Sequence, residues 1–209
     1  MGAFAWCKRL SAVAAMVLMM VPIAGANAPA GRQNLVQLIA SSQSIVAGTV
    51  RKVSDGVDAN GMPYTEVTIA VGGSPKGGVG PGDYTFRQFG LIKPRTLPNG
   101  QRLLMVTPAE FPLWRENEYV VAFLYHPAAK TGLQTTSGLA QGKLTRVNDR
   151  LSNVYDNAGL FENITVSPNA LSADEQALLQ SHGPVGTAAL LGLIGRIVKE
   201  QMIERGVIR

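Results

Sequence analysis

The sequence predicts a mainly β protein, built as a small antiparallel barrel or sandwich, with a short N-terminal helix and a C-terminal helical extension. From Ser44 onward, several short segments either alternate apolar and polar residues or are almost wholly apolar, and Gly, Pro, Asn and Asp separate them. Short strands divided in this way by turn residues are typical of small barrels and sandwiches. The segment 170–209 differs, because it carries a helix-start signal and a helical periodicity.

The β region begins with a predicted hairpin. Segments 44–53 and 64–71 flank Asn60-Gly61, a pair that favours a tight turn because both residues tolerate positive φ. Segment 118–125 is almost continuously apolar, which predicts a central strand buried on both faces. The glycine-rich segment 72–82 is expected to be a connection. Five further strands are predicted, over 83–89, 101–107, 133–136, 142–147 and 154–155.

Helices are predicted on both sides of this region. Asn34 is a candidate N-cap for a short helix over 34–42. Ser172, with Glu175 three residues later, forms a capping-box pattern. This pattern predicts a second helix that runs to about Gln180.

A longer amphipathic helix is predicted over 187–205, with Gly206 as its C′ residue. Its polar face carries both signs of charge, unlike a membrane-surface helix, whose polar face is rich in Lys and Arg. Amphipathic helices usually bury their apolar face within their own domain, so we expect this helix to pack on the β region. The alternative is a face that binds a partner, with Leu190, Ile194 and Ile197 as the candidate binding residues.

Residues 1–26 are predicted to be a cleavable secretory signal peptide. The first ten residues are basic and contain no acid, the apolar run 12–24 follows, and small residues end it. The run is too short to span a bilayer comfortably, which argues against a permanent anchor. Ala26 and Ala28 each end an A-x-A cleavage pattern. We favour Ala26, because cleavage after Ala28 would leave a proline at the new terminus.

Cleavage would remove Cys7, the only cysteine of the chain. The mature protein would then have no disulfide, no thiolate nucleophile and no cysteine-based metal site. Its formal net charge would fall from +5 to +3, because two basic residues leave with the signal. Arg51-Lys52 would be the only adjacent basic pair. A nucleic-acid-binding protein usually has a clustered basic face, so we expect no nucleic-acid partner. We also expect no integral membrane segment after cleavage.

The motifs of common enzyme and metal sites are not found. Neither His126 nor His182 has a second histidine or a carboxylate at metal-ligand spacing. Residues 58–61 match only part of an EF-hand loop, which leaves open a non-standard calcium site on Asp55 and Asp58. There is no G-x-S-x-G elbow and no phosphate-binding loop. We therefore predict no metal and no cofactor.

Two features leave a functional alternative open. Two carboxylates about 5–10 Å apart across a cleft would suit a glycosidase-type hydrolase, but the acids of the β region are scattered in the sequence. Trp114 is the only tryptophan after residue 26. It is either an exposed binding aromatic or a core plug carried by a loop, and we take Trp114 and Arg115 as candidate binding residues. The scattered acids include Glu66, Asp83, Glu110, Glu116, Glu118 and Asp149.

The order of these segments resembles a family of uncharacterised exported bacterial proteins with a compact OB-like or tissue-inhibitor-like β-barrel. The matching segments are 45–50 (IVAGTV), 64–69 (YTEVTI), 118–124 (EYVVAFL) and 138–144 (GLAQGKL). The resemblance covers about residues 35–161, and its motifs are structural. It implies an OB-like barrel and an association with secreted metalloproteases, but it supplies no catalytic residues. The metalloprotease inhibitors with this kind of barrel use an N-terminal cysteine, which the mature chain lacks.

The sequence thus predicts three parts: a signal peptide (1–26), a β-barrel domain (34–166) and C-terminal amphipathic helices packed on the barrel (170–209). We expect a non-enzymatic binding or accessory module that engages another exported protein in the periplasm or outside the cell. A carboxylate-based hydrolase is the alternative from a different class. A protease inhibitor or partner is the alternative that rests on the barrel analogy.

Overall fold

The computed structural model describes residues 32–97 and 99–209, and the predicted signal peptide, residues 1–26, lies outside them. The first element is helix α1, Leu35–Ser41. Asn34 is its N-cap as predicted, because the Asn34 side chain accepts the backbone N–H of Gln37 at 3.0 Å. The Gln37 side chain in turn accepts the N–H of Asn34 at 2.9 Å. This reciprocal pair satisfies two backbone donors that the helix itself cannot.

Strands β1, Ser44–Val57, and β2, Pro63–Lys76, form the predicted hairpin. In its turn, the Asp58 side chain accepts the N–H groups of Asn60 and Met62, each at 2.8 Å, and Gly61 has a φ of 80°. Both strands extend beyond their predicted ends. Residues 54–57 of β1 pair with residues 63–66 of β2, and the start of the glycine-rich segment pairs with the first residues of β1. Gly48 permits this close pairing: a Cβ there would lie 2.1 Å from the Ala70 carbonyl oxygen.

Seven strands form one antiparallel sheet in the order β3-β2-β1-β6-β7-β8-β9. The mainly β class is therefore confirmed. The sheet begins at β3 and ends at β9, and no pairing between these two strands closes the described residues into a barrel. The remaining sheet strands are β3 (Gly82–Phe89), β6 (Tyr119–Leu124), β7 (Lys143–Val147), β8 (Arg150–Ser152) and β9 (Val185–Gly186).

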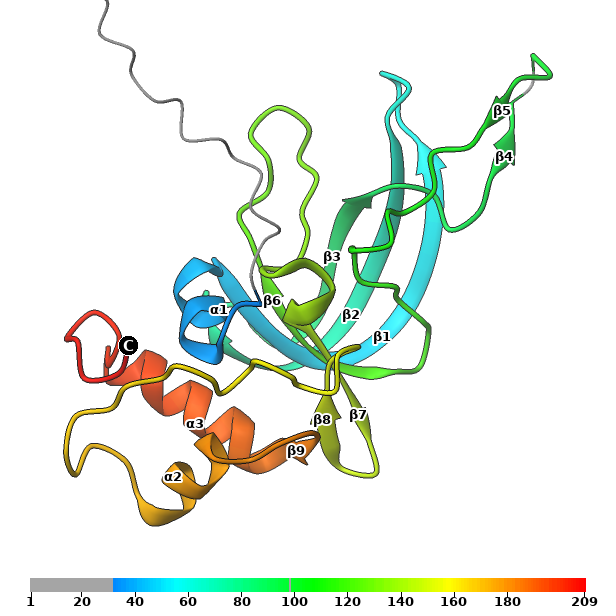
Figure 1. Cartoon of the computed structure of the whole chain (residues 1–209). Helices are drawn as coiled ribbons and strands as arrows, with labels where there is room; N and C mark the ends of the chain where they lie inside the picture. The colour runs from blue at the N-terminus through cyan, green and yellow to red at the C-terminus, as the bar shows by residue number, and fades with distance from the viewer. Residues whose placement is uncertain (1–31, 98) are drawn as a thin grey trace, which may run out of the picture. The chain divides into compact units, whose positions relative to one another are not determined.

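Strand β6 is the central buried strand that the sequence predicts. Val121 and Phe123 point to one face, where α1 and the C-terminal helix α3, Thr187–Lys199, pack (Figure 1). We call this the helix face. Val120, Ala122 and Leu124 point to the opposite face, together with Trp114, and we call that face the loop face. All five of these β6 side chains are fully buried.

Three predicted elements differ in the structure. The segment 101–107 contains only β5, Arg102–Leu103, which pairs with β4, Arg95–Thr96, in a separate two-stranded sheet. The segments 133–136 and 154–155 contain no strand; Thr136 makes an isolated bridge to Leu124. Between them, the short 3-10 helix η1, Leu139–Gly142, leads into β7.

The C-terminal helices begin where predicted, but the second ends early. Helix α2, Ala173–Leu179, starts at the Ser172–Glu175 capping box. Helix α3 ends at Lys199 rather than near residue 205, because the chain reverses at Gln201, whose φ is 51°. The reversal returns Met202 and Ile208 to the core of the helix face. Gly206 consequently lies in a later turn and does not end α3.

Candidate binding site

The loop before β6 carries Trp114 and Arg115, the two candidates in the β region. The Trp114 side chain is buried, and its indole N–H donates to the Gln88 side-chain oxygen at 3.1 Å. Its ring meets that of Phe86 edge-on, with 5.3 Å between centroids. Trp114 therefore packs as a core plug on the loop face, while Arg115 is exposed.

A buried ion pair lies beside Trp114. The Lys143 Nζ is 2.5 Å from the Glu118 Oε1, and the two side chains are 9% and 13% exposed. The same ammonium donates to the Leu113 carbonyl oxygen at 2.6 Å and lies 5.1 Å from the centroid of the Trp114 ring. The Glu118 Oε1 also accepts the backbone N–H of Arg115 at 2.9 Å. The pair thus fixes the loop that carries Trp114.

The sheet register accounts for the position of Lys143. Lys143 pairs with Ala122, and Thr145 pairs with Val120; directly paired residues of antiparallel strands point to the same face. Both side chains therefore lie on the loop face. Burial lowers the pKa of Lys143, and the hydrogen bond and the charge of Glu118 oppose this shift without cancelling it.

A cavity of about 430 Å³ opens over this ion pair. We call it the Lys143 cavity. Its rim is apolar and solvent-exposed: Leu113, Val154 and Tyr155 are 66%, 72% and 40% exposed. Exposed apolar residues that gather around a cavity are a feature of binding sites. Arg115 also lines this cavity, as do Glu118, Lys143 and Thr145.

The candidates on α3 are placed differently. Leu190, Ile194 and Ile197 are fully buried in the core of the helix face. Helix α3 therefore packs on the sheet, as one of the two interpretations of its apolar stripe expects. In this arrangement the three side chains have no surface on which a partner could bind.

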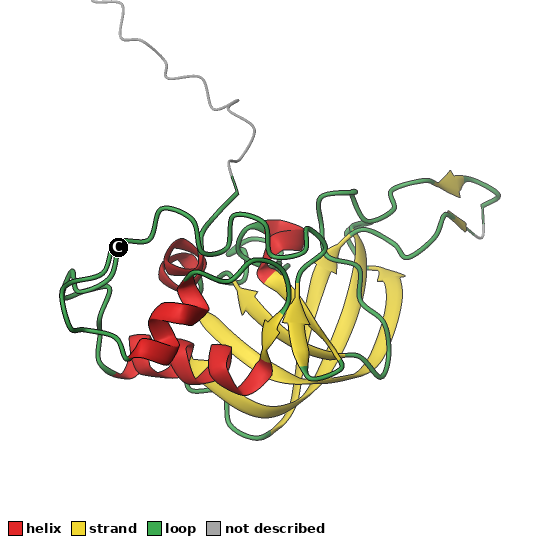
Figure 2. Ribbon diagram, turned by 60° about the horizontal axis from the view of Figure 1, so that its bottom comes forward, coloured by secondary structure: helices red, strands yellow, loops and turns green. Residues whose placement is uncertain are grey.

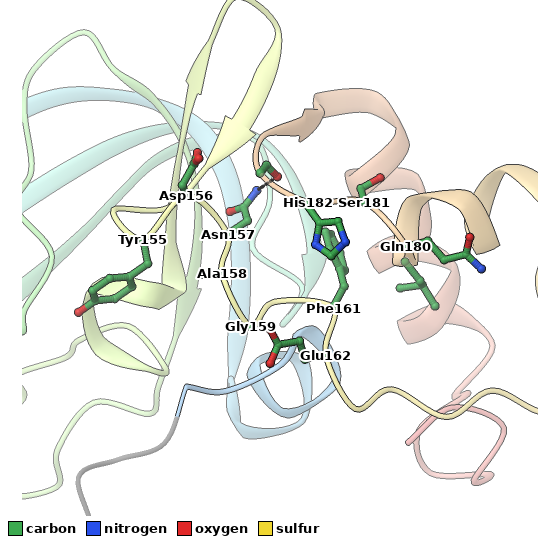
Figure 3. A pocket seen from close by; sticks show the side chains of 12 residues that line it. Tyr155, Asp156, Asn157, Ala158, Gly159, Phe161, Glu162, Gln180, Ser181 and His182 are labelled. Atoms are coloured by element: carbon green, nitrogen blue, oxygen red, sulfur yellow. Dashed lines mark hydrogen bonds between the residues drawn. The ribbon is translucent and has the colours of Figure 1, made fainter.

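A second cavity, of about 470 Å³, lies between the loop after β8 and the end of α2. Asp156, Glu162 and His182 are among the residues that line it, and we call it the His182 cavity. In Figure 3 the two carboxylates do not point toward each other. No hydrogen bond joins His182 to either acid in the described structure, whereas the Asp156 Oδ1 accepts the Ser152 hydroxyl at 3.2 Å. The cavity thus contains no assembled acid–base pair.

Three of the six acids named from the sequence of the β region are held in ion pairs. Glu66 pairs with Arg87 at 2.8 Å, and Asp83 pairs with Arg51 at 3.4 Å. Glu118 is bound to Lys143, whereas the other three acids, Glu110, Glu116 and Asp149, are exposed. This arrangement gives no support to a pair of carboxylates across a cleft.

Cation-binding features are equally sparse in the part of the chain that the structure describes. Asp55 pairs with Arg95 at 2.5 Å, and Asp58 is occupied by its own turn. No cluster of three or more His, Cys, Asp or Glu side chains in residues 32–97 and 99–209 is arranged to hold a metal ion. None of the described helices combines the length and the apolar character needed to cross a membrane.

Comparison with known proteins identifies no relative: no family model, no curated protein sequence and no solved structure matches the chain. The site therefore has to be interpreted from its own chemistry.

Sequence analysis does not identify the Lys143 cavity as a site. Its residues come from four separate segments, and Glu118 and Lys143 are joined only by the β6–β7 pairing. Lys143 follows a glycine within a structural motif, and nothing local distinguishes it from a surface lysine. The apolar segment Phe111-Pro112-Leu113-Trp114 between predicted strands is the sequence signal that could have indicated an apolar rim.

Proposed function

We propose that the protein is an exported, non-enzymatic binding module that engages another exported protein through the Lys143 cavity. The observation that carries this proposal is the exposed apolar rim of Leu113, Val154 and Tyr155 around a cavity whose charged floor is internally paired. Apolar side chains with this exposure gain free energy when a partner covers them. Glu118 and Lys143 are engaged with each other and with backbone groups, which suits a structural floor better than acid–base catalysis.

The chemistry of the cavity favours a protein segment as the ligand. Pockets of about 300–1,000 Å³ with apolar linings and a few polar groups accept groups of small-molecule size, and one or two apolar side chains of a partner fall in that range. Arg115 at the edge provides a planar guanidinium that is suited to a carbonyl or carboxylate next to those side chains. We expect the partner to present an apolar residue flanked by such an acceptor.

The export assignment and the family assignment belong to the same proposal. The basic start, the apolar run 12–24 and the A-x-A ending support export to the periplasm or beyond. The resemblance to exported proteins with an OB-like barrel is supported by the β1–β2 hairpin and by the central strand β6. Strands β3 and β9 do not pair, so the sheet is open. A barrel of this kind would therefore have to be closed by loops instead of by strand pairing.

A site-specific crosslinking experiment tests the proposed function. The chain carries a photo-crosslinking amino acid at position 113, and the matched control carries it at position 147, because Val147 is 65% exposed on the β7–β8 hairpin outside the cavity. After export and illumination, we expect position 113 to yield a discrete crosslinked protein that position 147 does not. Val154→Glu should abolish that product, whereas Val147→Glu should leave it unchanged.

Two outcomes contradict the proposal. Either position 113 yields no crosslinked protein, or the product persists when Val154→Glu places a charge on the rim.

Deletion of residues 170–209 is not a suitable control. It would remove Leu190, Ile194 and Ile197 from the core of the helix face, so a loss of binding would report unfolding.

A further inference from the structure

A β-arm extends from the sheet between β3 and β6. It comprises residues 92–97 and 99–107 and includes the small β4–β5 sheet, and Figure 2 shows it extending away from the seven-stranded sheet. Leu91 joins its base through backbone hydrogen bonds to Met105 and Thr107, at 3.0 and 2.9 Å. Asp55 holds its first strand by accepting the N–H of Ile92 at 2.9 Å and by pairing with Arg95.

The arm carries an unusual share of exposed apolar surface. Eight large apolar side chains are exposed in the described part of the chain, and four of them lie on the arm. Single exposed apolar residues are normal, but several on one projecting element indicate an interaction surface, and three of these four are consecutive in the chain. The four side chains are 39–63% exposed: Ile92, Leu104, Met105 and Val106.

The charge of the arm has one sign. Between residues 92 and 107 the sequence contains Lys93, Arg95 and Arg102 and no acid. Asp55 neutralises Arg95. Lys93 and Arg102 are exposed and belong to no ion pair among the described residues. Cationic and apolar groups thus share one projecting element.

We propose that this arm docks on an anionic phospholipid surface. Specific protein interfaces usually involve about 20–30 residues on each side, whereas the arm has 15 described residues and, unlike the rim around the Lys143 cavity, projects away from the sheet (Figure 2). Membrane association needs fewer contacting residues, because a few inserted apolar side chains add to the attraction between Lys or Arg and anionic headgroups. The small size and the projection of the arm favour a lipid surface over an acidic protein, and its positive charge complements anionic headgroups. This inference is independent of the Lys143 cavity.

Vesicle co-sedimentation tests the inference with residues 27–209. This chain contains the entire described core and lacks the apolar run 12–24, which would itself bind lipid. We expect binding to vesicles of phosphatidylcholine with phosphatidylglycerol, and little binding to phosphatidylcholine alone. Each cation near an anionic membrane contributes about 1 kcal/mol of binding free energy. The double variant Lys93→Gln with Arg102→Gln should therefore lower the partition coefficient about thirtyfold. Leu104→Ala should weaken it on the order of tenfold.

Matched controls lie outside the arm. Lys52→Gln removes an exposed cation from β1, and Val147→Ala shortens an apolar side chain as exposed as Leu104. Both should bind anionic vesicles like the parent chain. Unchanged circular dichroism and Tm of the arm variants would show that they fold, as their exposure leads us to expect. Absence of vesicle binding, equal binding to neutral vesicles, or equal loss in the controls would overturn the proposal, as would arm-dependent capture of an acidic protein without vesicle binding.

Discussion

The two faces of the seven-stranded sheet are covered in different ways. The helix face is closed by α1 and α3, whose buried apolar side chains pack on the sheet. The loop face has a smaller apolar cluster, and a loop that contains Trp114 closes it with the help of a buried ion pair and a Trp–Gln hydrogen bond. Among the described residues, three exposed large apolar side chains gather around the Lys143 cavity beside this loop.

This difference between the two faces predicts that one contributes mainly to stability and the other to binding. An amphipathic helix can cover a sheet face completely, because its apolar stripe matches the surface below it. A loop leaves backbone and side-chain polar groups that need their own partners, and here Lys143 and Glu118 provide several of them. Loops on a rigid sheet often carry function for this reason. We therefore expect substitutions on the helix face to affect folding and substitutions at the cavity rim to affect binding.

The largest effect is expected for Leu190→Ala on the helix face. Leu190 is fully buried between α3 and the sheet, and truncation of a buried leucine costs about 3–5 kcal/mol in lost transfer energy and cavity formation. Urea denaturation should show a lower midpoint with an unchanged m-value. A loss below about 1 kcal/mol would mean that α3 is not firmly packed, and the contrast between the two faces would fail.

Lys143→Met should have the next largest effect, on the loop face. The substitution leaves the Glu118 carboxylate buried beside Trp114 without its cation, which typically costs about 3 kcal/mol or more. The double variant Lys143→Met with Glu118→Gln removes both charges and should recover most of that loss. Urea denaturation of the four members of this cycle measures the coupling. If the double variant is no more stable than Lys143→Met, the pair does not act as a unit.

The same pair predicts a weak alkaline pH dependence. Burial holds the pKa of Lys143 below its ordinary value of 10.5, so between the folded and the unfolded pKa the unfolded chain binds more protons. The free energy of unfolding contributed by Lys143 should therefore rise with pH in that window and level off above about 10.4. Urea midpoints should rise more steeply with pH for the parent chain than for the double variant. All titratable groups other than Lys143 and Glu118 are common to both chains, so the difference in slope reports this pair. An identical slope for both chains would contradict this prediction.

The sequence predicts most of the elements of the fold but not their closure. Asn34, Asn60-Gly61 and Ser172 mark their turns and caps through local hydrogen bonds, so their positions can be recognised from a few neighbouring residues. The end of α3 depends on contacts that Met202 and Ile208 make with a distant core, and local periodicity does not contain that information. The same holds for the predicted barrel. Whether its edge strands pair depends on long-range contacts, which the local pattern of each strand does not determine.

The candidate site shows the limit more sharply. Trp114 stands out in the sequence because it is the only tryptophan after residue 26, and the structure resolves its two interpretations in favour of a core plug. The cavity beside it depends on Glu118 and Lys143, which meet only through the register of β6 and β7. The three candidates of α3 belong to an apolar stripe, and such a stripe has the same sequence pattern whether the helix packs on its own sheet or on a partner.

The smallest effect on stability is expected for Leu113→Ala, the same chemical change as Leu190→Ala on the opposite face. Leu113 is 66% exposed at the rim of the Lys143 cavity, and surface substitutions usually change stability by no more than about 0.5 kcal/mol. Its backbone carbonyl still accepts Lys143 in the variant, because that bond does not involve the side chain. We expect an unchanged urea midpoint. With the photo-crosslinking amino acid moved to position 154, on the same rim, we expect the crosslinked protein to form in the parent chain and to be lost in the Leu113→Ala variant. If Leu113→Ala lowers stability as much as Leu190→Ala does, the rim belongs to the core, and the proposed division between a stabilising face and a binding face is wrong.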